Sequence, residues 1–280
     1  MARRQIPPDG PSPGRSLATK CVLRSREKAL AKFAIVSDIH GNLAALDAVM
    51  ADIKSQAVDE ILCLGDVVGY GPRPCECLDL SMSFSFTVLG NHDSSAVFDP
   101  EGFNSSAERA IFWTRQQLHT KGGPADCKRR LEFICKMPRV MRRGGMLFVH
   151  GSPRGPTSEY VFPEDTQNPK KMEKLFSLIS HICFQGHTHV PGVFSSDLKF
   201  LRSEDVPEKF SFANKAKKWM VNVGSVGQPR DNDPRSCYLL VEDETLTFRR
   251  VPYDIERTIA AIYAEEDLEN LLGDRLREGR

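Results

Sequence analysis

The chain has 280 residues, of which 40% are hydrophobic and 27% are charged, so it is long enough to bury the core of one large domain or of two smaller ones. Its formal net charge of +1 conceals an uneven distribution: residues 1–30 carry seven Lys or Arg against two Asp or Glu, and the remainder carries 31 against 35. This slightly acidic remainder lacks the basic footprint that phosphate backbones require, which argues against nucleic acid as a partner.

Residues 1–30 have the composition of a disordered basic tail. The segment PPDGPSPGRS (7–16) is rich in Pro, Gly and Ser, and no apolar run there is long enough for a signal peptide or a membrane span. We therefore expect one folded domain over 31–280 and no membrane partner. The eight cysteines form no C-x-x-C pair, so we expect reduced thiols in a cytoplasmic protein.

From residue 33, short apolar runs alternate with amphipathic stretches. FAIVS (33–37), EILCLG (60–65) and FSFTVLG (84–90) predict strands, and apolar residues at helical spacing between 43 and 53 predict a helix. Residues 106–118 and 125–136 predict two further helices, which we interpret as a helical insertion. The β-α-β order predicts parallel strands covered by helices, an α/β fold.

The second half repeats this pattern. MLFVHGSP (146–153), HICFQGHTH (181–189) and WMVNVGSVG (219–227) each begin as a strand and end in a polar turn. Residues 237–252 predict a hairpin around Asp243 and Glu244, and residues 254–271 predict a final amphipathic helix. His119 and His181 stand outside the polar turns, and we interpret both as bystanders.

Nearly every predicted strand ends in a loop that carries Asp, Asn or His. These residues are Asp38, His40, Asp66, Asn91, His92, His150, His187 and His189. Sites in open α/β sheets assemble at the carboxyl ends of the strands. In an extended segment alternate side chains leave the same face, so we expect His187 and His189 to point toward one object from an exposed turn, with Thr188 facing away.

Apart from His92, this set offers two carboxylates, one amide oxygen and four imidazoles. Such donors suit divalent Mn, Fe, Zn or Co. Seven ligands are too many for one ion but fit two if one carboxylate bridges them, and ions about 3.5–4 Å apart can clamp the attacking and leaving oxygens of a phosphoryl displacement. The alternative is that these residues are separate caps and turns, where Asp and Asn are common.

Five blocks of the sequence resemble the calcineurin-like metallophosphoesterases. In the order that the family has, they are D-x-H (Asp38, His40), G-D (Gly65, Asp66), G-N-H-D (Gly90 to Asp93), an apolar strand ending in His150, and G-H-x-H (Gly186 to His189). NVGSVGQPRD (222–231) is similar to a segment of the small prokaryotic members. The resemblance implies a four-layer αββα sandwich of two mixed sheets.

The same resemblance implies how the ligands are shared. One ion would take Asp38, His40 and His189, the other would take Asn91, His150 and His187, and Asp66 would bridge them. A hydroxide between the ions would attack phosphorus in line. His92 would protonate the leaving oxygen as an imidazolium, or else only support the ligands from outside. Asp93 is then a supporting or helix-capping residue. Manganese is the ion that the family favours.

One block departs from part of the family. In the branch of protein phosphatases and diadenosine tetraphosphatases it reads G-D-x-V-D-R-G, whereas here it reads GDVVGYG (65–71). Gly69 and Tyr70 replace the Asp that orients the catalytic His and the Arg that holds phosphate. This favours a phosphodiesterase or phosphomonoesterase acting on a small phosphoester, and the activities of that branch remain the alternative.

Two further questions stay open at the level of sequence. Arg230, in the turn GQPRD, either holds substrate phosphate or pairs with Asp231 or Asp233 at the surface. Some proteins of this fold are binding scaffolds that have lost catalytic residues, but the presence of His92 and all seven ligands favours an enzyme. A homo-oligomer is compatible with the sequence.

Overall fold

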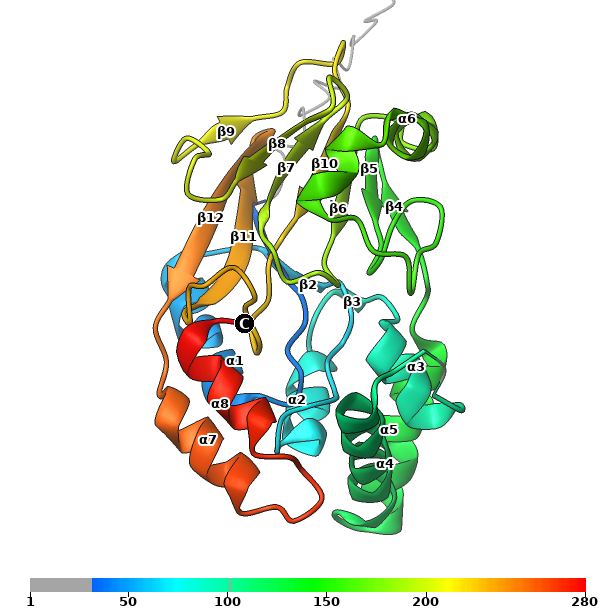
Figure 1. Cartoon of the computed structure of the whole chain (residues 1–280), viewed down its shortest axis with the longest axis vertical. Helices are drawn as coiled ribbons and strands as arrows, with labels where there is room; N and C mark the ends of the chain where they lie inside the picture. Colours follow the sequence, from blue (N-terminus) through cyan, green and yellow to red (C-terminus); the bar gives the residue numbers. More distant parts are fainter. Residues whose placement is uncertain (1–31, 101) are drawn as a thin grey trace, which may run out of the picture.

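Two six-stranded mixed sheets pack face to face between layers of helices (Figure 1). The computed structural model describes residues 32–100 and 102–280. The strand order is β3-β2-β1-β11-β12-β9 in the first sheet and β4-β5-β6-β10-β7-β8 in the second. The strands of the first sheet are β1 Phe33–Val36, β2 Glu60–Cys63, β3 Phe86–Thr87, β9 Phe210–Ser211, β11 Ser236–Glu242 and β12 Thr245–Val251. Those of the second are β4 Met141–Arg143, β5 Met146–Phe148, β6 Ile182–Gln185, β7 Gly192–Ser195, β8 Lys199–Arg202 and β10 Trp219–Asn222.

Each sheet contains a parallel group. Strands β1, β2 and β3 are parallel neighbours, and so are β5, β6 and β10. Strands β11 and β12 form the antiparallel hairpin that the sequence predicts. The predicted α/β sandwich of two mixed sheets is therefore confirmed. The parallel group lies at one edge of the first sheet, whereas β6 and β10 are central in the second.

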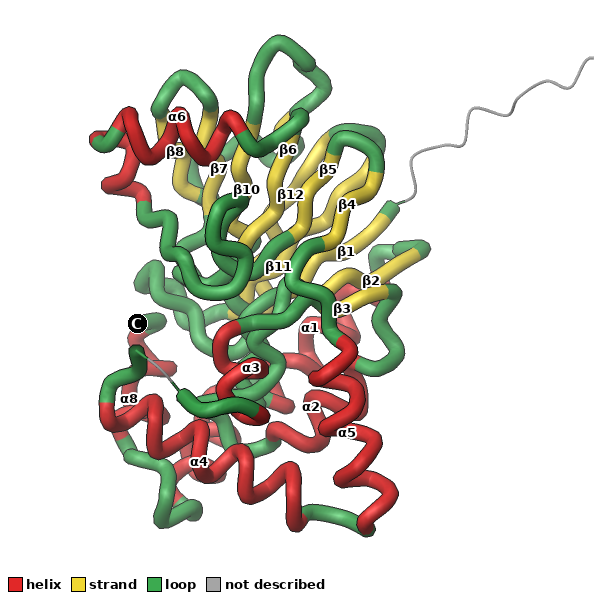
Figure 2. The backbone as a smooth tube through the Cα atoms, turned by 90° about the vertical axis from the view of Figure 1, so that its right-hand side faces the viewer, coloured by secondary structure: helices red, strands yellow, loops and turns green. Residues whose placement is uncertain are grey.

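Successive side chains along each strand point alternately to the core between the two sheets and to the outer helices, which explains the layered arrangement. Ile35 of β1 lies in the core between the two sheets, with Phe184 of β6 and Val221 of β10. Ala34 and Val36 face the other way and pack with residues of helices α1 Leu43–Ser55 and α2 Pro74–Ser81. On the second sheet, alternate residues of β5, β6 and β10 pack against helix α6 Pro169–Ser177. Figure 2 shows α6 apart from the other helices.

The helical insertion is also present. It comprises α3 Asn91–Val97, α4 Ser105–Thr120 and α5 Pro124–Lys136, between β3 and β4. Asn104 caps α4 by accepting a hydrogen bond from the backbone N–H of Ala107 (2.9 Å). A short 3₁₀ turn, Pro163–Gln167, precedes α6.

The prediction of one final helix over 254–271 is wrong. The chain forms two helices, α7 Ile255–Tyr263 and α8 Leu271–Glu278, joined by a polar turn. Folding back lets both apolar faces enter one cluster, in which Ile259 and Leu272 pack with Trp113 of α4. A single straight helix would leave one of these faces in water.

Other expectations concern the tail and the cysteines. The predicted tail 1–30 lies outside the described residues, and the domain boundary at residue 31 stays a prediction. The described cysteines are all free. In the described part of the chain, no helix combines the length and apolar composition that crossing a membrane requires.

A partly buried polar contact joins α1 to the first sheet. The hydroxyl of Tyr238 donates to Asp52 (2.7 Å), and Arg249 donates to the same carboxylate (2.8 and 3.1 Å). Burial raises the pKa of Asp52, but the hydrogen bonds from Arg249 and Tyr238 outweigh it and lower the pKa. The ionised carboxylate therefore stabilises the fold at neutral pH.

Asp52→Ala is expected to destabilise the protein by about 1–3 kcal/mol at pH 7, because it leaves Tyr238 and Arg249 without their acceptor. Since the folded-state pKa is lowered, this contribution is lost as the pH falls below about 4, the ordinary value of an aspartate. Thermal unfolding at neutral and acidic pH measures both effects. Asp47→Ala, at an exposed position of the same helix, is the control; an equal loss in both variants would contradict the assignment.

Candidate metal centre

The residues that the sequence places at strand ends come together where the parallel strands of both sheets end. Asp38, Asp66 and Asn91 follow β1, β2 and β3, whereas His150 and the pair His187 and His189 follow β5 and β6. All are buried except Asn91, which is partly buried. Two sheets thus contribute to one cluster.

The cluster has two halves. In the first, Nε2 of His189 lies 3.1 Å from Oδ1 of Asp38 and 3.1 Å from Nε2 of His40. In the second, Nε2 of His150 lies 3.1 Å from Oδ1 of Asn91 and 3.0 Å from Nδ1 of His187.

Asp66 lies between these halves. Its Oδ2 is 3.2 Å from Nε2 of His150 and 3.8 Å from Nε2 of His40. This arrangement has the grouping that the family resemblance implies for two ions with one bridging carboxylate.

Backbone carbonyls fix the orientation of all four imidazoles. A carbonyl can only accept, so the ring nitrogen that faces it carries the proton. The pairs are His40 Nδ1 with Val68 (3.1 Å), His150 Nδ1 with Leu64 (2.9 Å), His189 Nδ1 with Gln228 (2.6 Å) and His187 Nε2 with Ser158 (3.2 Å). The second nitrogen of each ring, a lone-pair donor, therefore faces the cluster.

When the rings are neutral, these lone pairs meet each other rather than a proton donor. Nε2 of His40 faces Nε2 of His189, and Nε2 of His150 faces Nδ1 of His187, at 3.0–3.1 Å. Oδ1 of Asp38 is buried and accepts no hydrogen bond within the described chain. Buried acceptors that face one another are costly unless a cation lies between them. The donor set therefore fits divalent metal ions.

The backbone at the ligands is unusual. Asp38, His40, Asp66, His187 and His189 all have φ between 49° and 68°, a left-handed conformation that costs about 1–3 kcal/mol in residues other than glycine. His187 and His189 are thus not in an extended segment, and the expectation of an exposed turn is also wrong, because their exposure is 4% and 1%. The backbone turns sharply at His187 and again at His189, and this brings the two side chains to different halves of the cluster.

Burial sets most of the protonation states of the metal-free cluster. It lowers the pKa of His40 and lowers that of His187 to about 3, which keeps these imidazoles in the neutral form that binds metal. Burial also acts to lower the pKa of His150, but the charge of Asp66 raises it to about 9. A proton and a metal ion would therefore compete at His150.

His92 stands beside the cluster and is not among the carbonyl-bound imidazoles. Its ring lies 4.8 Å from His40, 4.5 Å from Tyr70 and 4.9 Å from Phe103, measured between centroids. Nδ1 is buried and has no hydrogen-bond partner in the described chain. Burial lowers the pKa of His92 to about 4.

Gly69 explains why the motif departs from that of the phosphatase branch. Its φ is +96°, and a Cβ there would lie 2.4 Å from Nδ1 of His92. An aspartate at position 69 is therefore incompatible with this position of the imidazole. Asp93 instead accepts from the backbone N–H groups of Val68 (3.1 Å) and Gly90 (3.3 Å), which makes it a residue that caps α3.

Arg230 turns toward the cluster rather than to a surface carboxylate. Its Cζ lies 5.8 Å from the ring of Tyr70, and Nη2 donates to Gln228 (2.8 Å). Nε is buried without a partner among the described residues. Asp231 pairs with Arg250 and Asp233 pairs with Arg235, so the surface ion pair considered for Arg230 does not form.

Two aromatic residues of the cluster's rim gave no signal in the sequence. The ring of Tyr160 stacks on that of His187, with centroids 3.7 Å apart and planes at 19°. Phe162 in turn stacks with Tyr160, with centroids 5.3 Å apart and planes at 8°. Both lie in a loop without periodic apolar residues, where only the aromatic residue types themselves mark them.

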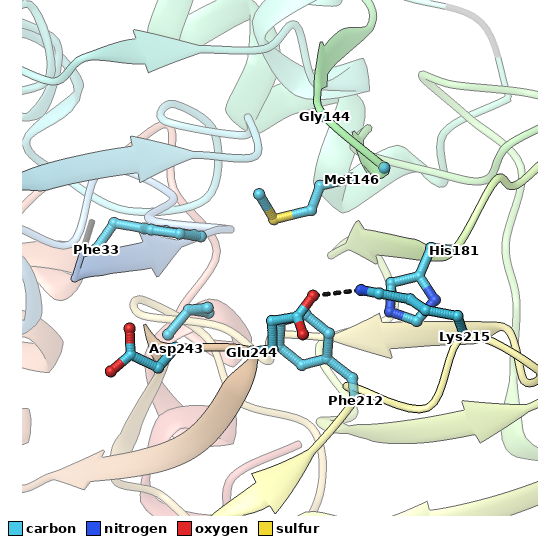
Figure 3. Close-up of a pocket in the computed structure, with 10 residues that line it drawn as sticks. Phe33, Gly144, Met146, His181, Phe212, Lys215, Asp243 and Glu244 are labelled. Atoms are coloured by element: carbon cyan, nitrogen blue, oxygen red, sulfur yellow. Dashed lines mark hydrogen bonds and ion pairs between the residues drawn. The ribbon is translucent and has the colours of Figure 1, made fainter. Parts of the chain in front are cut away.

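A cavity of about 290 Å³ lies at the opposite end of the sandwich (Figure 3). Its lining includes Phe33, Met146 and His181, which stand at the start of β1, at the start of β5 and directly before β6. The candidate ligands follow the other ends of these strands. His181 lies directly before β6 and lines this cavity, so it stands at the end of that strand opposite to His187 and His189.

Known proteins are similar to this chain in sequence and in fold. Residues 32–245 match the family model "calcineurin-like phosphoesterase superfamily domain". The uncharacterized protein MJ0912 of Methanocaldococcus jannaschii is 33% identical over 257 residues, which cover 88% of this chain and 98% of that protein.

Two solved structures are also similar to this chain. A metallophosphoesterase from Sphaerobacter thermophilus is 34% identical with a TM-score of 0.76, covering 89% of this chain and 99% of its own. The hypothetical protein PH1004 from Pyrococcus horikoshii OT3 is 18% identical with a TM-score of 0.69, covering 90% and 99%; this second likeness concerns the fold alone.

Proposed function

Because the chain belongs to the calcineurin-like phosphoesterase superfamily, we propose that it hydrolyses phosphodiester or phosphomonoester bonds with the help of two divalent metal ions. One observation carries the proposal: four imidazoles, each oriented by a backbone carbonyl, direct their free nitrogens at one another and at two carboxylates. Such convergence suits cations and has no evident use in a structural core.

The position of each residue in the cluster indicates which ion it would bind. Asp38, His40 and His189 would hold one ion, Asn91, His150 and His187 the other, and Asp66 would bridge them. Two ions in these places would lower the pKa of a bound water molecule and offset the charge on phosphoryl oxygens. The carbonyl contacts keep the imidazoles oriented, and burial excludes bulk water from the reacting groups.

His92 would act on the leaving group. It lies beside His40 and Asp66 without being needed as a ligand, and its Nδ1 has no partner among the described residues. An imidazole so placed can give a proton to the departing oxygen. Burial is the largest influence on the pKa of His92 and lowers it, whereas the charge of Asp66 acts in the opposite direction and favours the protonated ring.

The activity itself is tested with the purified protein loaded with manganese. Hydrolysis of bis(p-nitrophenyl) phosphate or p-nitrophenyl phosphate, abolished by chelation and restored by the ion, is the expected result. Absence of turnover on a broad panel of mono- and diesters, together with tight metal binding, would favour the scaffold alternative.

Arg230 is proposed as a holder of substrate phosphate. Burial lowers the pKa of His92 and His189, and the charge of Arg230 lowers both further, so its field reaches the cluster. The unpartnered Nε leaves one edge of the guanidinium available for an oxyanion.

Arg230→Ala is expected to lower kcat/KM by about tenfold, and Arg230→Lys to recover only part of it, because lysine lacks the planar fork. Steady-state kinetics of both variants measure this. Arg235→Ala removes an exposed arginine that pairs with Asp233 and serves as the control. Wild-type kinetics in Arg230→Ala would exclude a role in phosphate binding.

A further inference from the structure

The stacked rings of Tyr160 and Phe162, which we call the ring platform, lie at the edge of the metal centre. We propose that the ring platform binds a planar heteroaromatic ring carried by the second ester group of a phosphodiester, so that ring-bearing phosphodiesters are the preferred substrates. This inference rests on the proposed function and specifies its substrate class.

The exposure of the ring platform is the first observation. Tyr160 and Phe162 retain 43% and 42% of their accessible surface, although large aromatic side chains gain most from burial. The two rings are nearly parallel, and the inner one rests on the ring of His187. The exposed fractions of both rings leave aromatic surface beside the cluster with which another planar group can stack.

Polar contacts hold this loop in place. Lys171 donates to the carbonyl of Tyr160 (2.8 Å), and the backbone N–H of Phe162 donates to Asp165 (2.9 Å). Lys171 and Asp165 also pair with each other (2.6 Å), and the carbonyl of Ser158 accepts from His187. The rings are thus oriented before any ligand arrives, which reduces the entropy lost on binding.

The position of the ring platform favours a diester. His92 packs against His40, whereas Tyr160 packs against His187 of the other half. In an in-line displacement the leaving group departs toward its proton donor, here His92. A phosphodiester has a second substituent on phosphorus, and this substituent must extend from the cluster in another direction. The ring platform offers a surface for the second substituent. A monoester has no such substituent.

A cavity beside Phe162 indicates what kind of ring fits. It has a volume of about 210 Å³, and its lining includes Val190 and Pro191, which directly follow His189, together with Arg230. Glu164 and Arg202 also line it, and they offer a hydrogen-bond acceptor and a donor. A ring with N–H and carbonyl groups on its edge suits this lining better than a hydrocarbon ring.

Two substrates with the same leaving group test the proposal. Thymidine 5′-(p-nitrophenyl phosphate) and methyl p-nitrophenyl phosphate differ only in the second ester group. We expect kcat/KM of the wild type to be about tenfold or more higher for the thymidine ester, the usual effect of stacking one base. Phe162→Ala should remove most of this ratio, and Phe162→Trp should keep it. Phe162 is chosen because it stacks on Tyr160 and not on a proposed ligand.

Phe112→Ala, at an exposed phenylalanine of α4, is the matched control and should leave the ratio unchanged. A wild-type ratio near one, or an equal loss on both substrates in Phe162→Ala, would overturn the inference. Calorimetric titration of the chelated, inactive protein with thymidine 5′-monophosphate and methyl phosphate repeats the comparison without turnover. If neither diester is hydrolysed, the proposed function fails, while a binding preference lost in Phe162→Ala would still support the ring platform and an absent preference would reject it.

Discussion

Replacing Asp66 with asparagine is expected to reduce the metal content from the proposed two ions per chain to one or fewer and to lower turnover by at least about 100-fold. Even residues that only support metal ligands cause losses of about 10–100-fold, and Oδ2 of Asp66 lies within reach of both halves of the cluster, 3.2 Å from His150 and 3.8 Å from His40. An amide lacks the negative charge that a carboxylate shares between two cations.

Asparagine is the substitution that best separates metal binding from folding. Asp66 has φ of 51°, a conformation that asparagine tolerates, and the amide oxygen can still accept from the backbone N–H of His92, now bonded to Oδ1 at 2.9 Å. Elemental analysis after reconstitution with manganese, combined with kcat, measures the effect. Asp47→Asn, on the exposed face of α1, is the control. Full metal content and activity in Asp66→Asn, or a single ion in the wild type, would refute a bridged pair.

The sequence contained much of this centre because strand ends are easy to recognise. Short apolar runs such as FAIVS and EILCLG predict buried strands, and the polar residues that follow them are then expected at the edge of a sheet. Asp38 and Asp66 were therefore predictable without a structure. The pairing of ligands into two halves came from the family resemblance, since spacing along the chain does not reveal which strands are neighbours.

Elements with weak patterns were harder to predict. Strand β8 is an edge strand whose residues are largely exposed, so it shows no alternation, and α3 begins inside the G-N-H-D block, which reads as a turn. The stretch 254–271 has a continuous helical pattern, and only tertiary contacts decide where it breaks. Gly273 of α8 approaches Tyr263 of α7 so closely that a Cβ there would lie 3.0 Å from its ring, which indicates why the two helices can pack together.

The backbone conformation at the candidate ligands could not be predicted from the sequence. Alternation in an extended segment predicts that His187 and His189 point toward one object, but both have left-handed φ values and the two side chains reach different halves of the cluster. Such conformations are disfavoured locally and persist because the surrounding contacts impose them. Tyr160 and Phe162 were missed for a related reason: their positions depend on loop contacts to Lys171 and Asp165, which no periodicity reports.

His92→Ala is expected to leave the metal content intact and to lower kcat by about 10²–10⁴-fold on esters with poor leaving groups, the usual contribution of a general acid. The imidazole is close to the cluster but is not held by a backbone carbonyl in the described structure, unlike the four proposed ligands. Removing it should therefore affect the proton transfer and not the ions. With p-nitrophenolate as the leaving group, which departs without a proton, the loss should be much smaller.

The comparison of leaving groups distinguishes an acid from a structural residue. The ring of His92 fills the space against Gly69, Tyr70 and Phe103, so alanine also leaves a void, and His92→Gln keeps most of the volume without a group that titrates near neutrality. Both variants should show the same dependence on the leaving group if proton transfer is what is lost. His119→Ala, at an exposed histidine of α4, is the control. Equal losses on alkyl and p-nitrophenyl esters, with unchanged melting temperature, would assign His92 to positioning the substrate, because a defect in positioning slows every substrate whatever its leaving group.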